Sequence, residues 1–256
     1  MRFLLAVALA AVAAATVGAE IPREARRSGY DFASPEVRAM QDDDTANPGM
    51  LWVSQGEGLW AKKAGAAARS CQDCHGDAQT GMRGVAAGYP AFDAALGRPI
   101  DLEQRINLCR SEHQQTEPFA WESEDLLALT AFIARQSRGV PIAVENTPEL
   151  EPFSELGDKL FHQREGQFNL SCSQCHDDNW GKRLAGNVIP QAHPTGYPAY
   201  RLEWQSLGSL QRRLRNCMTG VRAEPYGYGA PEMVALELYL MQRARGMPIE
   251  TPAVRP

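Results

Sequence analysis

One five-residue motif occurs twice in this chain, and it constrains the fold of both halves. Segments 71–75 and 172–176 both read Cys-x-x-Cys-His, which is the attachment motif of c-type haem. On one helical turn the two cysteines form thioethers to the haem vinyl groups, and the histidine faces the iron. We therefore expect two covalently bound haem c groups. Their expected attachment residues are Cys71, Cys74 and the axial ligand His75 for one haem, and Cys172, Cys175 and the axial ligand His176 for the other.

The sequence around each motif is itself repeated. A glycine lies fifteen residues before the first cysteine of each motif, at Gly56 and Gly157. Downstream, segments 88–92 and 196–200 both read Gly-Tyr-Pro-Ala followed by an aromatic residue. A zinc site needs four ligands close together, whereas 97 residues lie between Cys74 and Cys172. The pattern therefore predicts two homologous haem modules.

Hydrophobic spacing predicts a mainly helical fold. Apolar residues recur near helical spacing from Ser123 to Gln136, with a counterpart at 232–243. We also expect helices over 56–64 and over 102–112, the latter opened by an N-cap at Asp101. No run of alternating apolar residues predicts a sizeable sheet. The predicted fold class is therefore mainly α, built from two duplicated cytochrome c-like modules and an irregular N-terminal extension.

Composition and the first residues predict where the protein acts and divide the chain. Residues 1–19 combine Arg2, an apolar run and small residues, as in a cleavable signal peptide. No later run approaches the roughly 20 apolar residues that a bilayer span needs, so we expect a periplasmic protein with no membrane span in its mature form. A net charge of −5 argues against nucleic-acid binding. The remaining expected segments are the extension at 20–48, whose acidic run 42–44 is interpreted as solvated surface, and haem domains at 49–146 and 147–256.

Two cysteines remain, and they occupy equivalent positions in the two halves. Cys109 and Cys217 each follow the tyrosine of their Gly-Tyr-Pro segment by twenty residues. They are interpreted as the sixth ligands of their own haems, with an inter-module disulfide or two buried thiols as open alternatives. Ligation is favoured because duplication does not naturally pair two repeats through identical positions. The competing ligands have no counterpart in the other half: Met82, Met218, Met233, His113, His162 and His193.

The order of these motifs resembles the SoxA family of dihaem cytochrome c subunits in the SoxAX complexes of bacterial sulfur oxidation. The resemblance covers nearly the whole mature chain and is most specific over Arg212–Leu240. It implies an L-cysteine S-thiosulfotransferase that joins thiosulfate oxidatively to a cysteine of a SoxYZ carrier, with a SoxX-type monohaem cytochrome as partner. By the same resemblance Cys217 is catalytic, can carry a persulfide and ligates the second haem. Arg213 then lies on the substrate side, and Cys109 ligates the first haem.

The residues near Cys217 suit that chemistry. Thiosulfate is a small dianion, so its site should offer donors and positive charge beside a nucleophilic sulfur. Arg213 lies four residues before Cys217 and therefore shares its helical face, and positive neighbours favour the thiolate. The nearby arginines of this half are Arg212, Arg213, Arg215 and Arg222. Arg105 precedes Cys109 by the same four residues, so this spacing alone does not distinguish the two halves.

Two further interpretations concern the second half and the function class. The glycines of segment 225–229 form either an opening at the haem edge or a turn. A periplasmic dihaem cytochrome c that acts only in electron transfer is the alternative function, because duplicated haem modules suit that role equally well. A dihaem peroxidase needs an iron site open to water, and a thiolate ligand on both haems argues against it.

Overall fold

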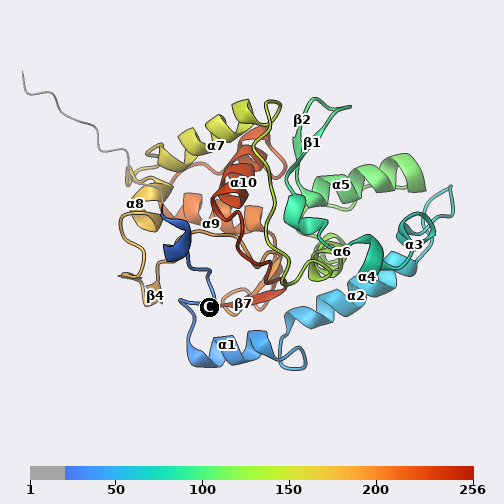
Figure 1. Ribbon diagram of the computed structural model, residues 1–256, viewed down its shortest axis with the longest axis horizontal. Helices are drawn as coiled ribbons and strands as arrows, with labels where there is room; N and C mark the ends of the chain where they lie inside the picture. The colour runs from blue at the N-terminus through green and yellow to red at the C-terminus, as the bar shows by residue number, and fades with distance from the viewer. Residues whose placement is uncertain (1–20) are drawn as a thin grey trace, which may run out of the picture.

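The computed structural model describes residues 21–256, so the expected signal peptide at 1–19 lies outside the described part. The helices are α1 (Pro35–Asp42), α2 (Gly49–Ala61), α3 (Cys71–His75), α4 (Ala78–Gly81), α5 (Leu102–Cys109), α6 (Glu124–Arg135), α7 (Glu151–His162), α8 (Cys172–His176), α9 (Leu210–Gly220) and α10 (Pro231–Arg243). The predicted mainly helical fold is confirmed (Figure 1). No helix within residues 21–256 is long and apolar enough to cross a membrane.

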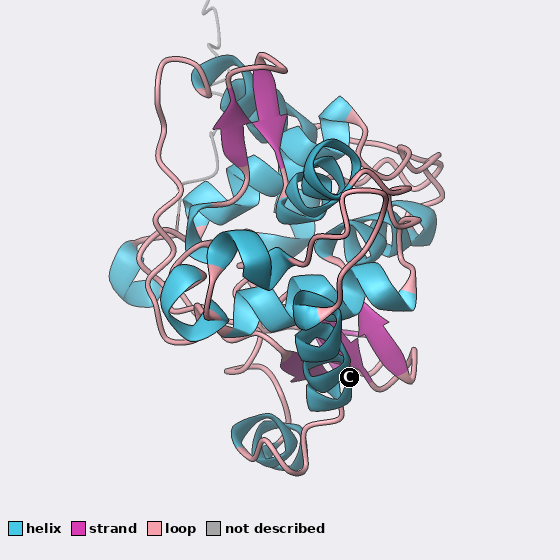
Figure 2. Ribbon diagram, turned by 90° about the vertical axis from the view of Figure 1, so that its right-hand side faces the viewer, coloured by secondary structure: helices cyan, strands magenta, loops and turns pink. Residues whose placement is uncertain are grey.

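The strands are short and lie at the margins of the helical body. They are β1 (Ala91–Asp93), β2 (Arg98–Ile100), β3 (Arg183–Leu184), β4 (Asn187–Val188), β5 (Ala199–Arg201), β6 (Ser206–Gly208) and β7 (Ala253–Arg255). β1–β2 and β3–β4 are antiparallel pairs, whereas β5 pairs antiparallel with β6 and parallel with β7. The β1–β2 hairpin and the sheet that contains β7 lie at opposite ends of the molecule (Figure 2).

Each Cys-x-x-Cys-His motif forms a single helical turn that its own sequence caps. The Ser70 hydroxyl accepts a hydrogen bond from the backbone N–H of Asp73, whose carboxylate accepts one from the Ser70 N–H. Ser171 and Gln174 form the same capping box at the start of α8. Because these caps satisfy N–H groups that a helix start leaves open, five residues suffice for a stable turn.

The repeated glycines lie where two helices cross in each module. A Cβ atom at Gly56 of α2 would lie 2.1 Å from the carbonyl oxygen of Ala128 in α6. A Cβ atom at Gly157 of α7 would lie 2.2 Å from the carbonyl oxygen of Ala235 in α10. Figure 1 shows α7 beside α10 and α2 near α6. The backbones therefore approach closely at both crossings, which explains the glycine at the same place in each half.

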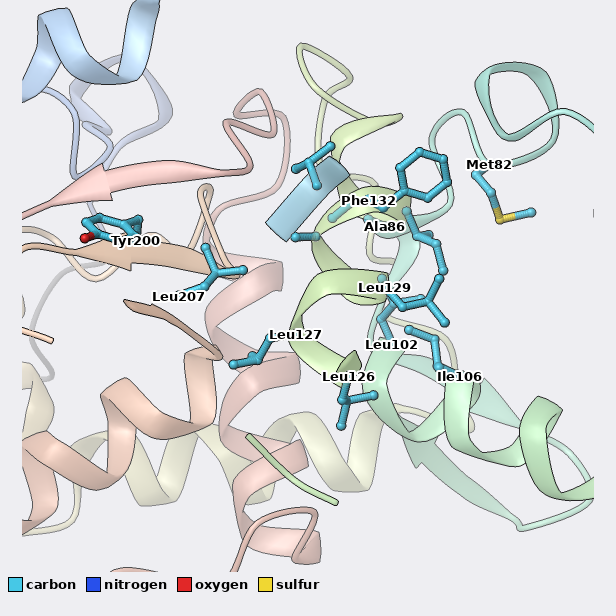
Figure 3. Packing of buried hydrophobic residues seen from close by; sticks show 14 of the residues in the cluster. Met82, Ala86, Leu102, Ile106, Leu126, Leu127, Leu129, Phe132, Tyr200 and Leu207 are labelled. Carbon is cyan, nitrogen blue, oxygen red and sulfur yellow. The ribbon is translucent and has the colours of Figure 1, made fainter. Parts of the chain in front are cut away.

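α6 lies at the centre of the largest apolar cluster, and this cluster joins the two modules. Leu126 and Leu129 of α6 are fully buried among Leu102 and Ile106 of α5 (Figure 3). The same cluster includes Leu207 of β6, which belongs to the second half of the chain. The second module thus adds residues to the core of the first, although it also has an apolar cluster of its own around Phe161 and Leu236.

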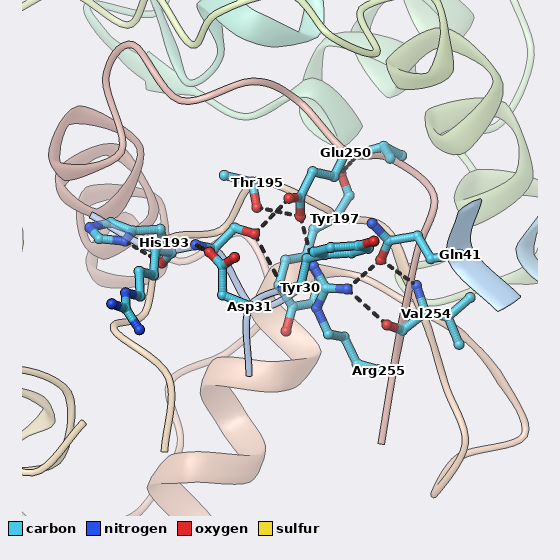
Figure 4. A network of polar contacts seen from close by, with 12 residues as sticks. Tyr30, Asp31, Gln41, His193, Thr195, Tyr197, Glu250, Val254 and Arg255 are labelled. Carbon is cyan, nitrogen blue, oxygen red and sulfur yellow. Dashed lines mark hydrogen bonds and ion pairs between the residues drawn. The ribbon is translucent and has the colours of Figure 1, made fainter. Parts of the chain in front are cut away.

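The N-terminal extension is irregular apart from a short 3₁₀ turn and α1, and it contacts both modules. The Ser28 hydroxyl donates to Glu250 at 2.6 Å, and the Asn47 amide donates to the Pro252 carbonyl at 2.9 Å. The Gln41 side chain accepts hydrogen bonds from the Val254 N–H and from Arg255 (Figure 4). These bonds hold residues 21–48 against the end of the chain.

The structure differs from the sequence expectations in three local details. The helix expected over 56–64 begins at Gly49 and ends at Ala61. The helix expected to reach 112 ends as α-helix at Cys109 and continues as a π-helical turn over 110–114. The interpretation of the acidic run 42–44 as only solvated surface is wrong for Asp44, because its carboxylate binds one arginine at the end of α6 and another three residues later. These are Arg135 at 2.8 Å and Arg138 at 2.6 Å.

Candidate active site

The two cysteines outside the motifs each lie beside the motif of their own module. None of the six cysteines forms a disulfide with another, so the alternative of a Cys109–Cys217 disulfide is wrong. Cys109 interacts electrostatically with Cys71 and Cys74. Cys217 interacts with Cys172 and Cys175 of α8 in the same way, and also makes a hydrogen bond with His176.

A cavity of about 160 Å³ opens beside His176 and Cys217. Its charged lining comes from Arg201 at the end of β5, from Arg213 on α9 and from Arg255, whose charge is paired with Glu250 at 2.8 Å. Its apolar lining includes Leu214 and Leu240. Both ends of the described chain complete its wall. The residues that they contribute are Gly29, Phe32, Ala33, Ala253, Arg255 and Pro256. The hydrogen bonds of Figure 4 hold these two segments together at the edge of the cavity.

The environment of His176 suits a haem iron ligand. Its Nδ1 atom lies 2.6 Å from the carbonyl oxygen of Pro190. A hydrogen bond at one ring nitrogen fixes the imidazole orientation and leaves the other nitrogen to bind a metal. In the first module the His75 ring lies against Trp60, with ring centroids 5.8 Å apart, and the Trp60 indole N–H donates to the carbonyl oxygen of Gly76. The residues in both modules therefore fit the haem attachment that the motifs predict.

The thiols of Cys217 and Cys109 lie in opposite electrostatic environments. Burial alone would raise the pKa of Cys217, but the hydrogen bond with His176 and the positive charges of Arg213 and Arg201 outweigh it. Together they lower the pKa of Cys217 to about 7. At Cys109 burial prevails over the attraction of Arg105, and the pKa is raised. The thiolate form, which is the nucleophile and metal ligand, is thus favoured at Cys217.

Only one of the four arginines that cluster around Cys217 in sequence lines the cavity. That one is Arg213, whose side chain is one-third exposed. The other three turn away and lie over aromatic rings. These contacts are Arg212 with Trp204 at 4.3 Å, Arg215 with Tyr228 at 4.6 Å and Arg222 with Phe168 at 4.8 Å. Of the four arginines that the sequence places near Cys217, only Arg213 therefore contributes its charge to the cavity.

The second positive charge comes from a residue that the sequence reasoning missed. Arg201 has a side chain that is only 8% exposed, and it lines the cavity together with Arg213. It lies outside the segment around Cys217, so proximity in sequence gave no reason to select it. A comparison of the two repeats could have identified it, because the first half has an oppositely charged residue, Asp93, at the equivalent position.

Segment 225–229 forms a turn against the first module and does not line the cavity. The Gly229 N–H donates to the Gln211 side chain at 2.8 Å, and a Cβ atom at Gly229 would lie 2.6 Å from the Trp121 ring. Tyr228 stacks on the same ring with centroids 6.0 Å apart. Of the two interpretations of these glycines, the turn is the one observed.

The methionines and histidines that competed as ligands have other contacts. Met82, Met218 and Met233 are buried in the apolar clusters. The Nδ1 atom of His193 lies 2.9 Å from the Arg27 carbonyl oxygen, so this buried imidazole joins the extension to the cavity wall. His162 pairs with Asp158 on the surface of α7.

Comparison with known proteins places this arrangement in one family. The model of the SoxA/TsdA cytochrome c domain matches residues 55–142 and 156–249. The L-cysteine S-thiosulfotransferase subunit SoxA of Pseudaminobacter salicylatoxidans is 40% identical over 89% of this chain and 80% of its own length. The subunit of the same name from Rhodovulum sulfidophilum is 34% identical over 90% of this chain and 80% of its own length.

A solved structure agrees with these sequence matches. The crystal structure of SoxXA from P. pantotrophus superimposes with a TM-score of 0.87 at 31% identity, covering 90% of this chain and 87% of that one. Two matched cytochrome c domains, the equivalent cysteines and the overall fold therefore lead to the same conclusion: the chain belongs to the SoxA family.

Proposed function

We propose that this chain is the SoxA subunit of an L-cysteine S-thiosulfotransferase, which joins thiosulfate to a cysteine of a SoxYZ-type carrier protein at the start of bacterial thiosulfate oxidation. Its relatives from Pseudaminobacter salicylatoxidans and Rhodovulum sulfidophilum carry that enzyme name. The observation that carries the proposal is the pairing of Cys217 and Arg213 in one cavity.

The proposed reaction has two steps, and both take place at Cys217. In the first, the Cys217 thiolate and thiosulfate form a sulfur–sulfur bond and release two electrons, which leaves a thiosulfonate group on Cys217. In the second, the thiolate of the carrier cysteine attacks that group and takes it over, so that Cys217 leaves as the thiolate again. If Cys217 carries a persulfide, its outer sulfur takes the same part. Arg213 offsets the substrate charge during the approach to the thiolate.

We also propose that two haem c groups are the cofactors of this reaction. Cys71 and Cys74 would attach one haem c, whose iron His75 and Cys109 would bind. Cys172 and Cys175 would attach the other, whose iron His176 and Cys217 would bind. When bound, haem supplies one-electron acceptance, so two electrons need two steps or two acceptors. The chain's own contribution is to orient His176 through Pro190 and to hold the cysteine sulfur beside it.

We also propose a partner subunit and a cellular compartment for this protein. The superimposed structure is named SoxXA, which supports a SoxX-type monohaem cytochrome as the second subunit and as a further electron acceptor. Residues 1–19 support export to the periplasm by a signal peptide.

Replacing the proposed nucleophile tests this function directly. Cys217→Ala should abolish thiosulfate-dependent cytochrome reduction in the presence of the carrier, because no sulfur remains to form the first bond. Mass spectrometry should then find no thiosulfonate group on the carrier cysteine. Covalent haem staining should show both haems still attached, since the attachment cysteines are untouched.

Two results would count against this function. Full thiosulfate-dependent activity in Cys217→Ala would rule out the mechanism. A wild-type complex that exchanges electrons with its partner but leaves the carrier cysteine unmodified would favour the electron-transfer alternative.

A further inference from the structure

The two modules carry opposite charges at one equivalent position beside their cysteines. Asp93 is the third residue of β1 and Arg201 is the third residue of β5, and each follows the repeated Gly-Tyr-Pro-Ala-aromatic segment. Both strands form an antiparallel hairpin with the next strand in the same register. The two side chains therefore start from corresponding places in the two modules.

In the first module the residue at this position, Asp93, forms an ion pair with Arg105, the arginine four residues before Cys109. An Nη2–Oδ2 distance of 2.5 Å joins Arg105 to Asp93, whose side chain is only 10% exposed. The Leu96 backbone N–H donates to the same carboxylate at 2.9 Å, which fixes its place. The charge of the arginine beside Cys109 is therefore compensated by a carboxylate of its own module.

In the second module the same position adds a positive charge. Arg201 and Arg213 line one cavity, and repulsion between them is the second cause, after burial, of a lowered pKa of Arg201. One carboxylate faces the pair: Glu203 lies 2.9 Å from Arg201 Nε and 3.9 Å from Arg213 Nη1, and its side chain is 42% exposed. A buried guanidinium is costly unless it is paired, and here two guanidiniums share one half-exposed carboxylate.

We propose that Arg201 is a second substrate-binding residue, which together with Arg213 holds the dianion beside Cys217. This inference rests on the proposed function. Thiosulfate carries two negative charges and has to approach a thiolate, so a single guanidinium leaves an uncompensated negative charge next to that sulfur. Two guanidiniums match the dianion, and their planar donor sets suit oxyanion oxygens. The change from Asp93 to Arg201 then explains why only one of two similar modules would bind substrate.

Anion binding is the readout that tests this inference on the intact haem-loaded complex. Calorimetric titration of thiosulfate without the carrier should give a Kd about tenfold weaker for Arg201→Gln than for the wild type. The KM for thiosulfate should rise by a similar factor, and Arg201→Lys should restore part of the affinity because it keeps the charge. Arg212→Gln is the matched control, since that guanidinium lies over Trp204 and does not line the cavity.

A second variant keeps the test decisive if Arg201→Gln folds poorly. Glu203→Gln removes the carboxylate that competes with the substrate for both guanidiniums, at a half-exposed position. It should therefore bind thiosulfate several-fold more tightly, in line with the strength of charge-assisted hydrogen bonds.

The opposite results would overturn the inference. An unchanged thiosulfate Kd in Arg201→Gln, with a shifted haem reduction potential, would mean that Arg201 pairs with a haem carboxylate instead. Weaker or unchanged binding by Glu203→Gln would also contradict it. Failure of the proposed function gives a different result: a wild-type complex that transfers no thiosulfonate group to the carrier, whatever the Arg201 variants bind.

Discussion

At the scale of single residues, the two modules differ in how the loop after each motif is held. In the second module Asp177, directly after His176, binds Arg243 of α10 at 2.6 Å, and both side chains are less than 10% exposed. The Arg243 guanidinium also lies 4.6 Å from the centre of the Phe161 ring. The equivalent residues of the first module are Gly76 and Gln136, which form no such pair. The second motif is therefore anchored by a buried ion pair that the first lacks.

Replacing Arg243 by the residue of the other module should destabilise the protein strongly. Arg243→Gln leaves the Asp177 carboxylate buried without its partner, which costs about 3–5 kcal/mol. The control is Arg135→Gln, which removes an ion pair of similar length between Arg135 and Asp44. In that pair the Arg135 side chain is 30% exposed and the Asp44 side chain is 41% exposed. That pair should contribute about 1 kcal/mol or less.

Thermal unfolding of the haem-loaded protein measures this difference. Arg243→Gln should lower Tm by roughly 10 °C and Arg135→Gln by a few degrees at most, given about 2–4 °C per kcal/mol for a chain of this size. Adding Asp177→Asn to Arg243→Gln should recover part of the loss, because it removes the unpaired charge. Equal Tm shifts for the two single variants would show that burial does not decide the strength of the pair.

The site could be predicted from sequence only where local spacing places a side chain. Arg213 lies one helical turn before Cys217, so the spacing predicted that both face one side of α9, and both line the cavity. Arg212 and Arg215 are as close in sequence but face other sides of the helix, over Trp204 and Tyr228. Arg201 reaches the cavity from a strand instead, and only tertiary structure brings a strand end beside a helix.

At the scale of elements, two helices of each module cross so closely that one of them has room only for a glycine at the crossing point. Gly56 and Gly157 occupy the same place in α2 and α7. Added Cβ atoms there would lie within 2.2 Å of a backbone oxygen of the opposite helix. Backbone oxygens move only with their helix, so the crossing has to widen to accept even one methyl group.

Alanine at either crossing glycine should therefore destabilise its module. Gly56→Ala and Gly157→Ala should each cost about 2 kcal/mol or more, which overpacking of a core typically costs. Gly58→Ala is the matched control, because Gly58 lies in α2 as well and a Cβ atom there meets nothing within 4 Å. It should be neutral or stabilising by up to about 1 kcal/mol, since alanine favours helix. Melting curves that place Gly56→Ala at or above Gly58→Ala would contradict the close approach.

The bounds of each helix or strand could be predicted only as well as its local sequence pattern marked them. α6 begins and ends within one residue of the expected 123–136, because Ser123 caps it and its apolar pattern is continuous. α2 begins seven residues earlier than expected, at Gly49, whose N–H donates to the Asn47 side chain just before the helix. The parallel pairing of β5 with β7 joins segments more than fifty residues apart, and no local pattern in such short strands indicates a distant partner.

At the scale of the whole molecule, the two modules meet through buried carboxyl groups. The Gln211 amide of the second module donates to Asp101 of the first at 2.7 Å and to Glu237 at 3.2 Å. A cavity of about 50 Å³ beside them is lined by residues from both modules, including Glu103 and the equivalent tyrosines Tyr89 and Tyr197. Its size leaves room for a few ordered water molecules.

These carboxyl groups predict that stability falls as pH rises. Burial raises the pKa of Asp101 to about 7, and burial together with the Asp101 charge raises that of Glu237 to about 8. Burial likewise raises the pKa of Glu103 well above its ordinary value. The folded protein thus keeps protons that the unfolded chain releases near pH 4, so their stabilising contribution is complete below that pH. It is lost as pH rises through the folded-state values near 7 and 8.

The expected outcome is a Tm of the haem-loaded protein that declines between pH 6 and 9 by several degrees, equivalent to at least about 1 kcal/mol. Glu237→Gln should flatten that decline, because an amide keeps its contact with Gln211 without ionising. Glu224→Gln, at an exposed position, should follow the wild-type curve. If the Glu237→Gln and wild-type curves run parallel from pH 6 to 9, this carboxyl does not govern the pH response. A flattened curve would instead show that ionisation of Glu237, at the junction of the two modules, causes much of the loss of stability at high pH.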